Sequence, residues 1–360
     1  MDYLLAIKTA VILFPILAFF ITGPYILYQY HKFASIHPLK TIIIYSFVFY
    51  LLCAYFLVIL PLPTIDSVME NPDWMIQPIP FHFVLDFIKE TPLVLSEPIT
   101  YIKTIFHPSF YVVSFNILLF VPLGMFLRYY KGYSLRKIIK VSFLLSLFFE
   151  FTQLTRLYGI YPKPYRLCDV DDLILNTFGG IVGYLLMLDL EKRIPSKEEF
   201  ECLAYKKGEV VSPLRRVTLF FLDLFIYFII TIFTKGRYSF LVFLIYFTIL
   251  PIFLDYKTLG SAFLNVRFKK LKNTFTYYLR PYLLYFYYLG VPYGIFAGAA
   301  FIGNYITSST IKITFYLLVI VLVFLFYIIN LVLLFIHERR FYDKLCYMEL
   351  ESTIKEKGHS

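Results

Sequence analysis

The sequence predicts an all-α, polytopic integral membrane protein with about nine transmembrane helices in two helical modules. Of the 360 residues, 59% are hydrophobic and only 16% are charged, which is too little polar surface for a soluble domain of this length. Several apolar runs reach the roughly 20 residues that cross about 30 Å of hydrocarbon. Each run should be helical, because lipid offers no hydrogen-bond partners to backbone N–H and C=O groups.

Nine apolar segments are predicted to span the membrane. In chain order they cover residues 4–28, 40–60, 110–128, 138–155, 172–190, 217–234, 238–254, 281–301 and 312–336. The first segment resembles a secretory signal peptide. It has no small-residue cleavage site after its apolar stretch, so we predict a retained span.

Two interruptions divide the chain into modules. Residues 1–190 form the first module, with an extracytoplasmic loop at 61–109, and a charged linker at 191–214 leads to a second module at 215–348. Residues 349–360 form a cytoplasmic tail that we expect to be disordered.

The loop at 61–109 is long enough to suggest a function. Its apolar side chains are predicted to lie in the lipid headgroup plane, with Trp74 as an interfacial anchor. These side chains are Phe81, Phe83, Leu85, Phe87 and Ile88. A packed lid with no function of its own explains the same residues equally well.

The formal net charge is +10, but no basic stripe lies on a soluble module, so we expect no nucleic-acid partner. Instead, most Lys and Arg residues fall in alternate loops, which is typical of cytoplasmic loops. This bias predicts an outside N-terminus and a cytoplasmic C-terminus, although Lys8 opposes it for the first span. Cys53, Cys168, Cys202 and Cys346 show no CxxC spacing, so neither a disulfide framework nor a zinc site is predicted.

Polar residues collect at the outer ends of three predicted spans. Glu150 and Gln153 share one helix face, and a stripe on the fifth span is polar at its outer end and continues to Gly179 and Gly183. The GxxxG spacing of these glycines favours close helix packing. Ionisable residues at membrane depth are costly and point to function. We define the outer cluster as Asn116, Glu150, Gln153, Arg156, Arg166, Asp169, Asp171, Asp172 and Asn176.

Three interpretations of the outer cluster stay open. It is either an Arg–carboxylate lattice that holds a loop, a site for a lipid headgroup, or a catalytic site. In a headgroup site, Arg156 and Arg166 would grip a phosphate and the carboxylates would be able to hold Mg²⁺. Catalysis needs a nucleophile or a positioned water, and no Ser/His pair is visible, so we lean against an enzyme.

Three separated motifs resemble the VanZ-like family over residues 40–190. They are FNILLFVPLG (Phe115–Gly124), EFTQ (Glu150–Gln153) and RLCDVDDLILNTFGGIVG (Arg166–Gly183). The family's polar positions fall on Asn116, Glu150, Gln153, Arg166, Asp169, Asp172, Asn176, Gly179 and Gly183. The resemblance implies a bacterial plasma-membrane protein and low-level resistance to teicoplanin and related lipoglycopeptides. It implies a phenotype and no particular reaction.

The second module has a different set of polar residues, at the ends of its spans that we predict to be cytoplasmic. We define the second cluster as Arg216, Asp223, Asp255, Thr258, Gly260, Arg340 and Asp343. With DYKTLG (Asp255–Gly260) and RRFYDKL (Arg339–Leu345), it resembles the RDD family over residues 210–348. The resemblance implies a transport role, with some members linked to cation exchange. A clamp in which Arg216 or Arg340 neutralises Asp223 is the structural alternative.

The leading hypothesis is therefore a cell-envelope protein that protects against lipoglycopeptides by binding a lipid-linked cell-wall precursor or the drug's lipid tail. The first alternative is a transporter of a small ion or lipid through the RDD-like half. The second is an intramembrane enzyme that acts on a polyprenyl phosphate or a glycolipid. Membrane lipids are expected partners in each case.

Overall fold

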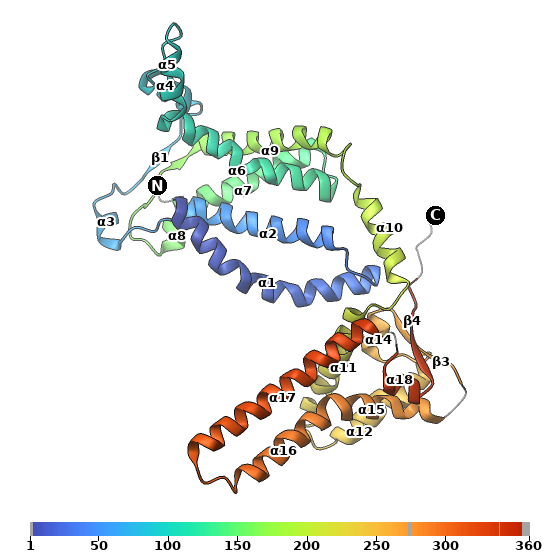
Figure 1. Ribbon diagram of the computed structural model, residues 1–360. Coiled ribbons are helices and arrows are strands. Elements are labelled where there is room, and N and C mark those ends of the chain that lie inside the picture. The colour runs from blue at the N-terminus through green and yellow to red at the C-terminus, as the bar shows by residue number, and fades with distance from the viewer. Residues whose placement is uncertain (1–2, 273–274, 338, 355–360) are drawn as a thin grey trace. The chain divides into compact units, whose positions relative to one another are not determined.

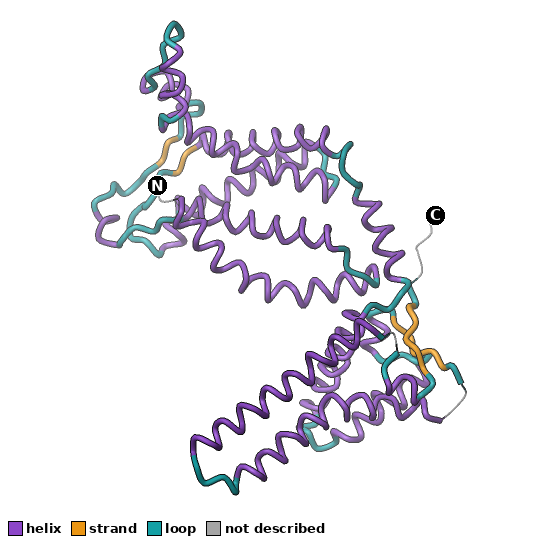
Figure 2. Tube along the Cα trace, in the orientation of Figure 1, coloured by secondary structure: helices purple, strands orange, loops and turns teal. Residues whose placement is uncertain are grey.

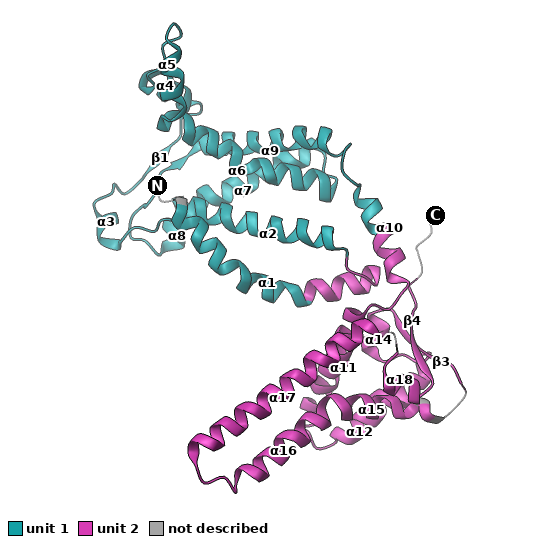
Figure 3. Cartoon of the chain, viewed as in Figure 1, with its two compact units in different colours: residues 1–23, 37–201 teal, residues 24–36, 202–360 magenta. Residues whose placement is uncertain are grey.

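The computed structural model describes residues 3–272, 275–337 and 339–354, and it is 74% helical (Figures 1 and 2). The chain divides into two compact units (Figure 3). Unit 1 comprises residues 1–23 and 37–201, and unit 2 comprises residues 24–36 and 202–360. The division passes through helix α1 (Tyr3–Phe33) and helix α10 (Lys197–Gly208).

Seven helices in the described residues are long and apolar enough to cross a membrane, so the chain is a multi-pass membrane protein. This confirms the all-α polytopic fold class. The seven are Leu4–Phe33, Pro38–Ile59, Pro108–Lys131, Val170–Leu190, Pro213–Phe233, Arg280–Gly303 and Ser309–Ile336.

Two predicted spans fall outside that set for different physical reasons. Helix α7 (Leu135–Leu154) is a complete helix, but it carries Arg136, Lys137, Lys140 and Glu150. The apolar stretch Ser239–Phe253 is shorter than the roughly 20 residues that a span needs. It consists of α12 (Ser239–Leu244), a π-helical segment η1 (Ile245–Ile249) and α13 (Leu250–Phe253).

Unit 1 is a bundle built on α2 (Pro38–Ile59), α6 (Pro108–Lys131), α7 and α9 (Val170–Leu190). Helix α6 starts with Pro108 and ends at Gly132, whose positive φ of 63° suits a left-handed C-terminal cap. The Tyr50 hydroxyl donates to the Leu119 carbonyl at 2.6 Å and ties α2 to α6. In α1, Phe14 packs edge-on against Phe49 of α2.

Glycines allow α9 to lie against its neighbours without intervening side chains. A Cβ atom added at Gly179 or Gly183 would collide with the Ile117 or Val121 carbonyl of α6, and one added at Gly180 would collide with Ser142 of α7. The stripe predicted from spacing is therefore the closest contact between α6 and α9.

The loop predicted at 61–109 contains three short helices and a strand. They are α3 (Ile65–Met69), β1 (Ile76–Gln77), α4 (His82–Glu90) and α5 (Pro98–Ile105). Strand β1 pairs in parallel with β2 (Cys168–Asp169), which leads directly into α9, and α8 (Arg156–Gly159) follows α7. We call residues 81–106, with α4 and α5, the arm; it projects away from the bundle at the end where α6 and α9 begin (Figure 1).

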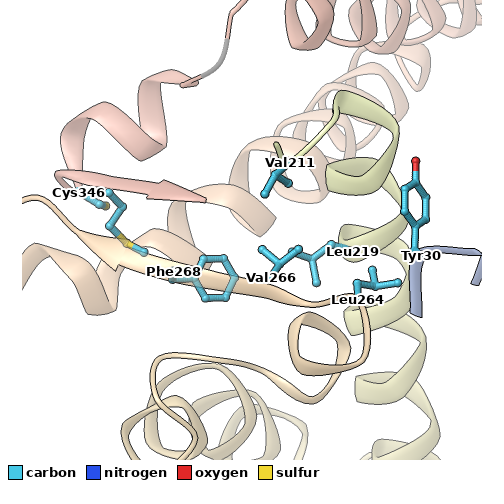
Figure 4. Packing of buried hydrophobic residues seen from close by; sticks show 8 residues of the cluster. Tyr30, Val211, Leu219, Leu264, Val266, Phe268 and Cys346 are labelled. Atoms are coloured by element: carbon cyan, nitrogen blue, oxygen red, sulfur yellow. The ribbon is translucent and has the colours of Figure 1, made fainter. Parts of the chain in front are cut away.

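Unit 2 combines helices with a small two-stranded sheet that lies at one end of α17 (Figure 1). The helices are α11 (Pro213–Phe233), α14 (Leu259–Phe263), η2 (Phe275–Leu279), α15 (Arg280–Tyr285), η3 (Phe286–Gly290), α16 (Val291–Gly303), α17 (Ser309–Ile336) and α18 (Phe341–Leu345). Strand β3 (Val266–Lys270) pairs antiparallel with β4 (Met348–Ser352), with Phe268 opposite Leu350. Tyr30, Leu219 and Leu264 pack against this sheet in one buried apolar cluster (Figure 4).

Arg215, at the start of α11, is fully buried and holds this end of unit 2 together. Its guanidinium donates to the Leu264, Gly208 and Asn265 carbonyl oxygens at 2.9, 3.0 and 2.5 Å, and to the Ser352 hydroxyl at 3.2 Å. These bonds join α10, α11, the two residues that lead into β3, and β4. Removing the side chain would leave several buried carbonyl groups unpaired.

The prediction of a disordered tail is wrong for its first residues, because Glu349–Ser352 belong to β4. They pair with β3, and Lys269 of β3 forms ion pairs with Glu349 at 3.3 Å and Glu351 at 3.4 Å. This pairing depends on a strand more than 70 residues earlier, which local composition does not reveal. Residues 355–360 of the predicted tail lie outside the described residues.

Gly183→Ala tests the close contact in α9. The added methyl group meets the α6 backbone, so we expect a loss of about 1–3 kcal/mol in unfolding free energy. Gly298→Ala in α16 is the control, because its Cβ atom would meet nothing within 4 Å. That substitution should be neutral or stabilising by up to about 1 kcal/mol. Thermal unfolding in detergent measures both; equal effects at the two positions would contradict the packing role.

Candidate functional site

The arm is attached to the outer cluster through Asp171. This buried carboxylate accepts the backbone N–H of Phe81 at 2.5 Å and that of Phe83 at 2.9 Å, and it thereby caps the start of α4. Its own backbone N–H donates to Asp169 at 2.8 Å, so Asp169 caps α9 in turn. Two consecutive caps therefore place an exposed apolar segment beside the polar end of the bundle.

Glu150 lies on α7 and is only 3% exposed. Its Oε2 atom accepts the backbone N–H of Asp169 at 2.9 Å, and the Cys168 thiol donates to the same carboxylate. Burial raises the pKa of Asp169, and the hydrogen bond from the Asp171 N–H opposes that shift. Glu150 thus holds the strand β2 at the entrance to α9.

Asp172 and Asn176 continue this polar strip along α9. The Asn116 amide of α6 donates to the Asp172 carboxylate, and Arg166 lies close enough to Asp172 for an electrostatic interaction. Asn176 donates to the Ser146 hydroxyl at 2.9 Å. The structure therefore brings α6, α7 and α9 together through polar contacts at one end, as their spacing predicted.

One predicted member, Arg156, lies apart from the others. Arg156 does not join the carboxylates; its guanidinium donates to the Asp73 and Pro162 carbonyl oxygens at 2.9 and 2.5 Å and stacks over Trp74. The reversal of the chain at α8, where Arg156 itself has a φ of 57°, turns the side chain toward the loop. Gln153 is buried on α7. Arg166 donates to the Val58 carbonyl of α2.

Backbone N–H groups donate to several of the outer carboxylate oxygens. Both Asp171 carboxylate oxygens accept hydrogen bonds from backbone N–H groups. One oxygen of Asp169 and one of Glu150 do the same. Within the described part of the chain, no three His, Cys, Asp or Glu side chains are grouped as a metal site would require. The carboxylates act as acceptors for the loop backbone.

Sequence reasoning missed two residues at this site. His82 and Asp86 form a pair at 2.9 Å on α4, and both act electrostatically on Asp169. Their i, i+4 spacing on one helix face was the available signal. This spacing alone does not place the pair at the site, because only the tertiary contact brings α4 to the start of α9.

In unit 2, the second cluster is organised around Asp223, which is 3% exposed. Its carboxylate accepts the Tyr246 and Thr258 hydroxyl groups at 2.7 and 2.8 Å and the Gly260 N–H at 3.1 Å. A side chain at Gly260 would collide with Asp223, so the glycine permits this approach. Sequence reasoning found Thr258 and Gly260 but missed Tyr246, which η1 supplies.

The remaining charges form a second group. Arg280 pairs with Asp343 at 2.7 Å, and the Arg340 guanidinium donates to the Asn330 amide oxygen at 2.5 Å. Arg340 therefore does not serve as the clamp on Asp223; Arg280 provides an electrostatic interaction with that carboxylate instead. Asp255 also stays outside the cluster, since it forms an exposed pair with Arg267 at 3.0 Å. Its positive φ of 51° turns it away from the apolar core.

A cavity of about 550 Å³ lies beside Asp223 in unit 2. Arg216, Asp223, Arg280, Arg340 and Asp343 line it, together with apolar side chains of α11, α15, η3 and α17. This volume lies within the usual range for pockets that hold small molecules.

Alkylation of Cys168 reports the charge of Glu150. Burial and the adjacent Glu150 carboxylate raise the pKa of the Cys168 thiol to about 11. Because the thiolate is the reactive form, a protein whose other three cysteines are Ala should react slowly at neutral pH and faster toward pH 11. Glu150→Gln should shift this rate profile to lower pH, and Glu70→Gln in the loop should not. An unchanged profile in Glu150→Gln would refute the contact.

Comparison with known proteins covers part of the chain. No curated protein and no solved structure matches it. The family model described as VanZ/LLP1 matches residues 47–194. This segment lies in unit 1 and contains every residue of the outer cluster, together with the arm. Over residues 47–194 the chain is therefore similar to the VanZ/LLP1 family, as its motifs predicted.

Proposed function

We propose that this protein resides in the bacterial plasma membrane and protects the cell against teicoplanin and related lipoglycopeptides. It does so by binding a lipid-linked molecule, or the drug's lipid tail, at the outer leaflet. The similarity of residues 47–194 to the VanZ/LLP1 family supports the general class of envelope protein. The proposal that it binds a lipid-linked molecule or the drug's tail rests on the position of the arm beside the outer cluster.

The arm offers an apolar surface that its own unit does not cover. Ile88 on α4 is 70% exposed and Phe106 after α5 is 76% exposed, and Leu85, Ile99 and Ile102 are exposed as well. Such a surface on short amphipathic helices is typical of segments that lie in the lipid headgroup region.

Asp171 anchors this apolar surface directly to a polar one. The outer cluster gathers the carboxylates of Glu150, Asp169, Asp171 and Asp172, and of its two guanidinium groups only that of Arg166 acts on one of them, Asp172. A molecule with a lipid tail and a polar head that carries amine or hydroxyl groups would therefore find partners for both ends within one site.

Drug susceptibility tests this proposal in a susceptible Gram-positive host. Wild type should raise the inhibitory concentration of teicoplanin and have little effect on that of vancomycin. Ile88→Gln with Ile102→Gln should weaken protection, because the burial of each Ile side chain away from water contributes about 1.5–3 kcal/mol to the binding free energy. Glu150→Gln should weaken it by loosening the strand that positions α9.

Lys89→Gln with Lys103→Gln is the matched control, since it alters the same two helices without removing apolar surface. All proteins are compared at equal abundance in the membrane. Full protection by the Ile variant would exclude the arm, and no protection by the wild type would refute the proposed function.

Unit 2 supports a second candidate function, transport of a small ion or lipid, in line with its RDD-like motifs. The observation in its favour is Asp223, a buried carboxylate that borders a cavity within a membrane unit. Ionisable groups in such positions commonly mark transport pathways.

Asp223→Asn should abolish proton- or sodium-coupled flux into vesicles if this carboxylate carries the ion. Asp255→Asn is the control, because Asp255 forms an exposed ion pair with Arg267 and does not line the cavity. Flux measured with a pH-sensitive dye in proteoliposomes distinguishes the two variants. Retained flux in Asp223→Asn would remove Asp223 from the transport step.

A further inference from the structure

The cavity of unit 2 has charged and apolar walls at different places. Arg280, Arg340 and Asp343 lie at the end near β3, β4 and α18, while Leu224, Leu284 and Leu331 line the part between the long helices. A site with this division suits a molecule that has a charged head and an apolar chain.

Three guanidinium groups and two carboxylates line the cavity. They belong to Arg216, Arg280 and Arg340, and to Asp223 and Asp343. Asp343 is committed to Arg280 at 2.7 Å. Asp223 already accepts three hydrogen bonds from hydroxyl and backbone groups.

The guanidinium of Arg340 has no carboxylate partner among the described residues. The residue is only 7% exposed, and its guanidinium donates to the oxygen of the neutral Asn330 amide at 2.5 Å. Its Nε atom is buried without a hydrogen-bond partner, and no described carboxylate forms an ion pair with its guanidinium. A buried cation without a counter-charge is costly, and an anionic ligand would relieve that cost.

Part of the lining of the cavity is also exposed on the apolar surface of unit 2. Phe221 of α11, Leu289 of η3 and Leu331 of α17 line the cavity and are also exposed on the unit's apolar surface. An apolar chain can therefore enter from the bilayer between these helices and keep its head at the charged end.

We propose that this cavity binds one single-chain amphiphile with a monoanionic head, a carboxylate or a phosphate ester. The head bonds to Arg340, and the chain lies along α11 and α17. This inference deepens the second candidate function by naming its ligand class. It requires binding alone, so it can fail or succeed independently of coupled flux.

Native mass spectrometry of the full-length protein in a nonionic detergent tests the proposal with oleate as the probe. We expect one equivalent of oleate to bind. Oleyl alcohol, which has a similar chain and no charge, and acetate, which has the charge and no chain, should each bind roughly tenfold to hundredfold more weakly. Equal binding of oleyl alcohol would refute the anion site, and equal binding of acetate would refute the lipid chain.

Variants locate the site. Arg340→Gln should weaken oleate binding by roughly tenfold to hundredfold, Arg340→Lys should retain most of it, and the exposed Arg237→Gln should leave it unchanged. Leu284→Trp keeps every charge, fills the apolar part and should block binding, which tests the site even if Arg340→Gln fails to fold. Wild-type affinity in Leu284→Trp would overturn the proposal.

Discussion

The burial of helix carboxylates is the constraint on which this structure depends. A carboxylate that is removed from water must accept hydrogen bonds from the protein, because otherwise its burial costs several kcal/mol of folding free energy. Asp171, Glu150 and Asp223 obtain them from backbone N–H groups of other segments. Because each bond fixes a loop against a helix, the positions of α4, β2 and α14 follow from these three side chains.

The two units meet this constraint with different outcomes. In unit 1, glycines bring α6 and α9 together, and the outer carboxylates are engaged by the loop that they hold. In unit 2, the rings of Phe247 and Tyr285 pack against each other and line a cavity. The proposed ligand of unit 1 would therefore bind on its surface, beside the arm, and that of unit 2 would bind inside the cavity.

Patterns along one helix predicted much of both clusters. The spacing of Glu150, Asp172 and Asn176 placed them on helix faces, and Thr258 and Gly260 followed from a short motif. Arg156 and Asp255 were misassigned because both follow a helix end with positive φ, where the side-chain direction is set by the turn. Arg215 takes the buried structural role in α11, although sequence reasoning singled out its neighbour Arg216.

Composition and hydrophobic length determined that this chain is helical and crosses the membrane several times, because lipid permits few other solutions. Local motifs also determined the similarity of residues 47–194 to the VanZ/LLP1 family. Only the tertiary structure decided which donors reach each carboxylate, that Glu349–Ser352 complete a sheet, and that Arg340 remains without a carboxylate beside a cavity. These features arise from contacts between residues far apart in the chain, which patterns along a single helix or loop do not specify.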